Sequence, residues 1–130
     1  MKKILFVFCA ALIALASCNT VKKADNSLLK NSWTNLHEEN QDGVMVFRPT
    51  HSQEFAPSMY RLVLDLKDNN VAEYLVLSPV DAHYMESGKW RFDSNTQQLT
   101  ITDKDDKTVH AYQVLEVTKD LLRVKEVAKQ

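Results

Sequence analysis

Residues 88–93 read Gly88-Lys89-Trp90-Arg91-Phe92-Asp93, so that small or aromatic residues alternate with charged ones. A period of two residues is typical of a strand with one buried face and one solvent-exposed face. The stretch 60–66 follows the same rule, with one apolar face made of Tyr60, Leu62, Leu64 and Leu66. Along 108–118 the apolar face is expected to hold Val109, Ala111, Leu115 and Val117, opposite His110, Tyr112 and Glu116. The chain therefore predicts an all-β fold.

Eight short runs of this kind follow one another from Ser32 onward, separated by polar turns rich in Asp, Asn and Ser, which suit turns. The expected strands are 32–38, 44–49, 59–67, 71–78, 83–92, 98–102, 108–118 and 121–127. A spacing of about 12 residues per strand leaves no room for crossover helices, which excludes a parallel α/β sheet. The pattern predicts an eight-stranded up-and-down antiparallel barrel, which has no free edges, or alternatively an open β-sandwich.

Composition sets the class of protein. The chain has 130 residues, of which 45% are hydrophobic and 25% are charged, which suits one globular domain. The formal net charge of −1 argues against a nucleic-acid partner.

The N-terminus has the features of an export signal. Two lysines precede an apolar run from Ile4 to Ala16, which is too short to span a bilayer and fits a signal peptide. The following Leu15-Ala16-Ser17-Cys18 resembles the lipobox of bacterial lipoproteins. That resemblance implies cleavage before Cys18, lipid on its thiol and anchoring in a membrane of the cell envelope. Asn19 would favour the outer membrane. The alternative is an ordinary signal peptide with a chance cysteine.

The expected organisation is a signal peptide over 1–17, a tether over 18–30 and a β-barrel domain over 31–130. The chain has two cysteines, Cys9 inside the signal and Cys18 at the lipidation site. The exported domain therefore lacks a disulfide, cysteine-ligated zinc and a cysteine nucleophile. A packed core has to stabilise it.

Several short motifs resemble a known family. They are Asn31-Ser32-Trp33, Phe47-Arg48-Pro49, the stretch Phe55 to Arg61, the stretch Asp81 to Tyr84, and Gly88-Lys89-Trp90. Residues 31–127 resemble the lipocalin-like (calycin) small lipoproteins of bacteria, in which Gly-x-Trp opens the first strand; here Asn31 replaces the glycine. The resemblance implies a lipocalin-like barrel. It extends to a bacterial subgroup of uncharacterised function and names no activity, because such barrels have many roles.

The polar residues are expected to meet at one end of the barrel. In an up-and-down order, the connections 50–58, 79–82 and 103–107 lie at the end that holds both termini. The candidate ligand-binding residues there are Arg48, Tyr60, Arg61, Asp81, His83 and Tyr84. Arg48 and Arg61 could bind a carboxylate or a phosphate headgroup. The other interpretation is a belt of ion pairs among Arg48, Arg61 and Asp81 that holds the loops, with Trp33 packed beside Arg91 or Arg123 at a closed end. No spacing matches a metal or catalytic motif, so no metal, cofactor or enzymatic activity is expected.

Two functions compete. The first is binding of a small apolar or amphipathic ligand inside the barrel, in a pocket lined by Met45, Met59 and Met85. The second is an interaction module of the envelope, an inhibitor or accessory subunit, that presents the loop 50–58 to a partner protein. Pro49 and Pro57 would stiffen that loop and Phe55 would form its tip.

Overall fold

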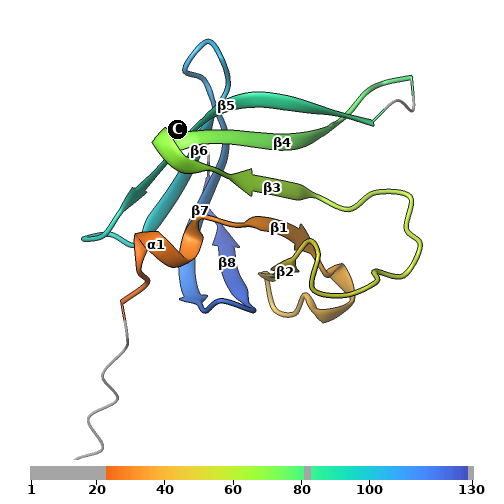
Figure 1. The fold of residues 1–130 in the computed structure, drawn as a ribbon, viewed down its shortest axis with the longest axis horizontal. Coiled ribbons are helices and arrows are strands. Elements are labelled where there is room, and N and C mark those ends of the chain that lie inside the picture. The colour runs from red at the N-terminus through yellow and green to blue at the C-terminus, as the bar shows by residue number, and fades with distance from the viewer. Residues whose placement is uncertain (1–22, 81–82, 129–130) are drawn as a thin grey trace, which may run out of the picture.

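The computed structural model describes residues 23–80 and 83–128, and in them eight antiparallel strands close into a barrel (Figure 1). The strands are β1 (Ser32–Asn35), β2 (Val44–Pro49), β3 (Val63–Leu66), β4 (Val71–Leu77), β5 (His83–Asp93), β6 (Gln98–Thr102), β7 (Thr108–Val117) and β8 (Leu122–Glu126). Short helical segments add α1 (Asn26–Leu29), η1 (His37–Glu39) and η2 (Asp68–Asn70). The prediction of a closed eight-stranded antiparallel barrel is confirmed, and the open sandwich is excluded.

The order of the strands differs from a simple up-and-down succession at one place. Strands β3 to β8 pair in sequence, but β1 pairs with both β2 and β3, while β2 pairs with β8. Strands β2 and β3 therefore flank β1 and run in the same direction. The segment 50–62 joins them by returning along β1, where Thr50 N–H donates to Ser32 O and Asn35 N–H donates to Leu62 O. A tight hairpin cannot join β2 to β3, because both are antiparallel to β1 and therefore parallel to each other.

This order also changes what lies at each end of the barrel. The turns 67–70, 94–97 and 118–121 share one end with the start of β1, which we call the α1 end. The turns 78–82 and 103–107 lie at the opposite, distal end. Because β2 and β3 point the same way, β1 starts at the α1 end while β8 finishes at the distal end. The expectation that both chain ends of the barrel lie beside 79–82 and 103–107 is wrong.

Side chains from strands all around the barrel fill its interior. Leu62, Leu64 and Leu66 are buried as predicted, and so is Trp90. The largest side chains with almost no exposed surface include Trp33, Phe47, Tyr74 and Tyr112. Such interdigitated aromatic and aliphatic side chains supply the burial that a disulfide-free domain needs.

Strand β7 presents the predicted face only in part: Val109 and Val117 pack against the core as predicted, but Leu115 does not. Tyr112 and Val114 are buried in the core, whereas Leu115 is 41% exposed. The register against β8 shifts between Val114 and Glu116, a β-bulge that interrupts the two-residue period. Ala111 is buried on the outer side.

Strand β5 bends at Gly88. A Cβ at this position would lie 1.9 Å from the carbonyl oxygen of Thr102, at the end of β6. Only glycine permits so close an approach of the two backbones. Beyond it the strands separate: β6 pairs with β5 only from Lys89 to Asp93, whereas β4 pairs with β5 from His83 to Lys89.

Part of the expected tether 18–30 packs on the barrel. Leu29 is fully buried, and the indole Nε1–H of Trp33 donates to its carbonyl oxygen at 2.9 Å. Ala24 N–H donates to Gln97 Oε1 at 2.6 Å, and Lys30 pairs with Asp68 at 2.9 Å. These contacts fix α1 against two turns of the α1 end.

The signal peptide 1–17, the lipidation site Cys18 and the candidate residue Asp81 lie outside the described residues. Within the described part of the chain, no helix is long and apolar enough to cross a membrane.

Candidate functional site

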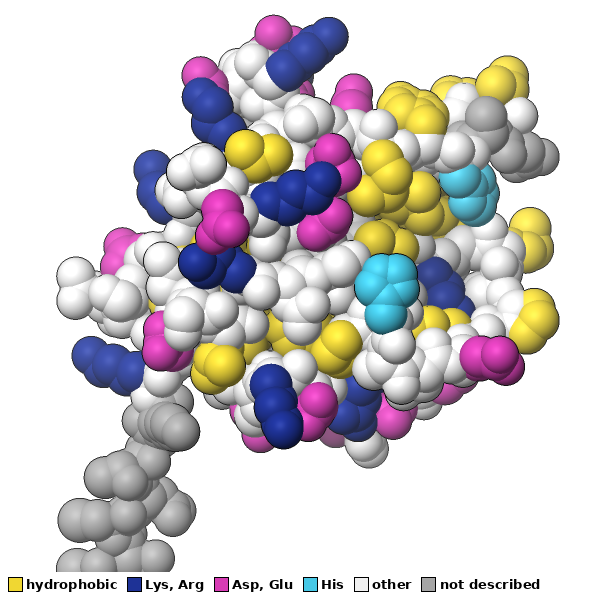
Figure 2. All heavy atoms as spheres, in the orientation of Figure 1, with side chains coloured by type: hydrophobic (Ala, Val, Ile, Leu, Met, Phe, Trp, Pro, Cys, Tyr) yellow, Lys and Arg dark blue, Asp and Glu magenta, His cyan; other side chains and the backbone are white. Residues whose placement is uncertain are grey.

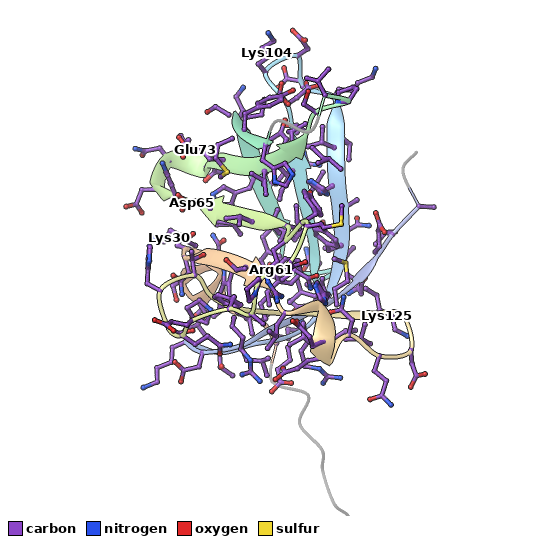
Figure 3. All side chains as sticks on the ribbon, turned by 90° about the vertical axis from the view of Figure 1, so that its right-hand side faces the viewer. Lys30, Arg61, Asp65, Glu73, Lys104 and Lys125 are labelled. Atoms are coloured by element: carbon purple, nitrogen blue, oxygen red, sulfur yellow. The ribbon has the colours of Figure 1, made fainter. Side chains whose placement is uncertain are left out.

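Arg61 is a structural clamp on the loop that precedes it. Its guanidinium forms two hydrogen bonds with the carboxylate of Glu38, at 2.9 and 2.5 Å, and donates to Ala56 O at 3.1 and 2.8 Å. It also donates to Asn35 O and lies 5.7 Å from the centre of the Phe55 ring. Figure 3 shows Arg61 in the middle of this side of the molecule. The hydrogen bonds from Arg61 hold the pKa of Glu38 down, at about 2.

Arg48 is paired in the same region by the neighbouring glutamate. Its guanidinium donates to Glu39 Oε2 at 3.0 Å and to Asp120 O at 3.4 Å. The two arginines thus meet adjacent carboxylates of η1. An anionic ligand at either arginine would have to displace a glutamate, so these contacts favour the interpretation of the arginines as an ion-pair belt. Among the described residues, the carboxylates of this belt are Glu38, which pairs with Arg61, and Glu39, which pairs with Arg48.

Trp33 makes no cation–π contact with Arg91 or Arg123. Its indole N–H is bonded to α1, and Arg123 pairs with Glu116 at 3.3 Å instead. The predicted packing of Trp33 beside one of these arginines is therefore wrong. Among the described residues, Arg61 makes a cation–π contact with Phe55.

Tyr60, His83 and Tyr84 do come together at the distal end. The rings of Tyr60 and His83 form an edge-to-face contact, with centroids 5.8 Å apart. Tyr60 Oη donates to Leu75 O at 3.3 Å, so that the ring is held against the edge of β4. Burial raises the pKa of Tyr60. Tyr84 is 48% exposed on the neighbouring strand.

A second group of polar and aromatic side chains, which the sequence did not indicate, lies at this end of the barrel. The ring of His110 lies between Tyr74 and Tyr112, with centroid distances of 5.7 and 5.8 Å. Tyr112 Oη is 3.1 Å from His110 Nδ1, and Tyr74 Oη donates to Glu86 at 3.2 Å. Tyr74 and Tyr112 are almost completely buried, so this group belongs to the core at this end of the barrel.

Burial dominates the electrostatics of this group. It raises the pKa of Tyr74 to about 12, with a further contribution from the negative charge of Glu86. Burial also raises the pKa of Tyr112. Both phenols therefore stay neutral hydrogen-bonding groups over the whole physiological range of pH. The only signal in the sequence was that His110 and Tyr112 are two residues apart and so lie on one face of a strand. That face was predicted to be exposed to solvent.

Several pockets lie on the outside of the barrel. Those described here are not lined by Trp33, Phe47 or Tyr112. One of them, of about 450 Å³, lies over polar side chains of β5 and β6, such as Arg91 and Thr100. Buried side chains such as Trp33, Phe47 and Tyr112 occupy the interior of the barrel, and a small ligand bound there stays a prediction.

The distal end instead carries an exposed apolar surface, the apolar tip. It consists of Met59, Leu77, Val80, Tyr84 and Met85, which are 94%, 52%, 82%, 48% and 44% exposed. These are five of the seven large hydrophobic residues exposed in the described part of the chain. Figure 2 shows hydrophobic side chains gathered at the upper right, over the end of the β4–β5 hairpin. A concentration of this kind marks an interaction site more often than chance exposure does.

The loop 50–58 contributes differently from the expectation. Phe55 is half-buried beneath Arg61 and does not form an exposed tip. Met59, four residues after Phe55, is the large apolar side chain that this connection exposes. Pro57 and Ala56 are exposed beside it.

In the described part of the chain, no three His, Cys, Asp or Glu side chains lie close enough to hold a metal ion.

Comparison of the chain with models of protein families, with curated proteins and with solved structures gave no match in any of the three.

Proposed function

We propose that this protein is a lipid-anchored module of the bacterial cell envelope that docks a partner protein through the apolar tip. The observation that carries the proposal is the concentration of exposed apolar side chains at the distal end of a barrel with a filled interior. Tyrosine and methionine are enriched in protein interfaces, and three of the five tip residues are of these types.

The position of the anchor supports this proposal. Cys18 lies five residues before Lys23, where the described chain begins, and an extended segment of that length spans at most about 17 Å. Ala24 is already bonded to Gln97 at the α1 end. A lipid on Cys18 would therefore hold the α1 end close to the membrane. The apolar tip points away from α1 (Figure 1), toward the space where a partner would be met.

The competing proposal, an apolar ligand inside the barrel, has less support. The three methionines expected to line a pocket are separated: Met45 packs on the core, whereas Met59 and Met85 are exposed at the tip. We therefore place the interaction module first and the ligand-binding barrel second.

Photocrosslinking in the native envelope tests the proposal. A photoreactive amino acid at Val80 reports on the apolar tip, and one at Lys119, in a turn of the α1 end, is the matched control. We expect a discrete crosslinked protein from Val80 and none from Lys119, and we expect Leu77→Asp to abolish the product. Equal crosslinking from both positions would contradict docking at the tip. So would a discrete small-molecule mass on the gently purified protein in native mass spectrometry.

A further inference from the structure

Half of β5 has a free edge. Strand β4 covers one side of β5 from His83 to Lys89, but β6 covers the other side only from Lys89 onward. In the described chain, the stretch His83–Ser87 has no strand on its second side. The close approach of Gly88 to Thr102 marks the point where β6 leaves β5. A pocket of about 320 Å³ opens at this point and is lined by Ser87, Gly88, Lys89, Asp103 and Lys104.

The hydrogen-bond pattern identifies which backbone groups face this edge. Lys67 N–H donates to Val71 O, so the odd-numbered residues of β4 bond toward β3 and the even-numbered ones toward β5. Through the register that pairs Tyr74 with Glu86, the even-numbered residues of β5 bond to β4. The N–H and C=O groups of His83, Met85 and Ser87 therefore point to the free edge, where the described strands offer them no paired residue.

This edge lacks the usual protection. Natural proteins block exposed edges with lysine, proline, a bulge or a covering loop, because an open edge adds strands from other chains. Residues 83–87 read His-Tyr-Met-Glu-Ser, with neither lysine nor proline. Two of them, Tyr84 and Met85, belong to the apolar tip. Open backbone groups and exposed apolar side chains thus occur on the same five residues.

We propose that the partner is bound by strand addition: an extended segment of the partner protein pairs with His83–Ser87 and continues the sheet beyond β5. This inference rests on the proposed function and specifies how the tip engages its partner. In this mode of recognition, main-chain hydrogen bonds supply affinity and alternate side chains supply specificity. The edge offers three N–H and three C=O groups for that ladder.

The charges beside the edge define the chemistry of the segment. Glu86 shares its face of β5 with Tyr84 and accepts one hydrogen bond, from Tyr74. A carboxylate accepts more than one bond, so Glu86 can take a further donor. Asp103, whose negative charge also raises the pKa of Tyr74, shares the pocket beside the edge with Lys89 and Lys104. The added strand should therefore place a lysine or arginine opposite Glu86 and apolar side chains on its other face, against Met85.

The test uses a display library of random ten-residue peptides, selected on the chain from Asn19 onward, which contains every described contact. Selected peptides should carry one basic residue within an alternating apolar pattern. Binding should weaken about tenfold or more in Met85→Pro, which removes an edge N–H without touching the bonds to β4, and should persist in the matched control Met85→Leu. Glu86→Gln should abolish the preference for a basic residue over glutamine.

A second measurement does not depend on the folding of a variant. N-methylation of alternate backbone amides in a selected peptide should abolish binding to the unaltered protein in one register and leave it unchanged in the other. Strand addition would be overturned if the two methylated peptides bound the protein equally well, or if Met85→Pro and Met85→Leu bound a selected peptide equally well. Failure to select any peptide would also overturn it. So would a dimer of the free protein in sedimentation that Met85→Pro dissociates, because a second copy would then occupy the edge. Crosslinking from Val80 that survives Met85→Pro would overturn strand addition while leaving the proposed function intact.

Discussion

Substitution of Gly88 by alanine tests the close approach that ends the β5–β6 ladder. The added Cβ would lie 1.9 Å from Thr102 O, whereas an ordinary van der Waals contact begins at 3.4 Å, so the two strands must separate by about 1.5 Å. That movement breaks or stretches the pairing of Lys89 with Thr102, worth about 1 kcal/mol per hydrogen bond, and adds the cost of overpacking. We expect a loss of about 3 kcal/mol in the free energy of unfolding.

Thermal unfolding followed by circular dichroism measures this loss. For a domain of this size, about 3 kcal/mol corresponds to a fall in melting temperature of roughly 10–20 °C. Gly43→Ala is the matched control, because Gly43 has a φ of 77° and no atom within 4 Å of its missing Cβ. That substitution costs only the left-handed conformation, about 1 kcal/mol. A Gly88→Ala variant that melts at or above the temperature of Gly43→Ala would refute the close packing of β5 on β6.

Three further predictions concern individual contacts. Arg61→Gln should release the segment 50–62, which we expect to be cut much faster in limited proteolysis while Arg48→Gln leaves the rate nearly unchanged. The pKa of Glu38 lies at about 2 in the folded state, below the 4.5 of the unfolded chain. Ionised Glu38 therefore stabilises the fold fully above pH 4.5, and this stabilisation is lost as the pH falls toward 2. The fall in melting temperature on acidification should therefore be smaller in Glu38→Gln than in the unaltered protein. Trp33→Phe leaves a carbonyl of α1 without its donor and should lower the free energy of unfolding in urea by about 1–3 kcal/mol, and an unchanged value would contradict the docking of α1.

The barrel could be predicted from the sequence because its strands carry a regular pattern. Leu62, Leu64 and Leu66 alternate with polar or half-buried neighbours, and each of them is buried. The number and spacing of the strands favoured a closed barrel, and the structure excluded the open β-sandwich that the sequence left as an alternative. These are local properties, which a single sequence records directly.

The arrangement of β1, β2 and β3 could not be predicted in the same way. Which strand lies beside β1 depends on contacts between distant segments, such as the pairing of Trp33 with both Leu64 and Pro49. The face of β7 was misjudged for Tyr112 and Val114, which are buried in the core. The β-bulge between Val114 and Glu116 then lets Val117 pack against the same core, and a bulge leaves little trace in the residue pattern.

The candidate site was foreseen only in part. The sequence indicated Tyr60, His83 and Tyr84, which the structure brings together at the distal end. It gave no sign that Glu38 and Glu39 would neutralise the two arginines, because a short helical turn between β1 and β2 brings them there. The free edge of β5 was also hidden, because it arises from the length of β6 relative to β5.

The central claim is that β5 offers an open edge at the end of the barrel that points away from the anchor. Amide hydrogen exchange, resolved residue by residue by NMR in the free protein, tests it most directly. We expect rapid exchange for His83, Met85 and Ser87, and protection of Tyr84 and Glu86 by about a hundredfold or more, because only the latter two amides bond to β4. Uniform protection of all five amides would show that the edge is covered and would contradict the account.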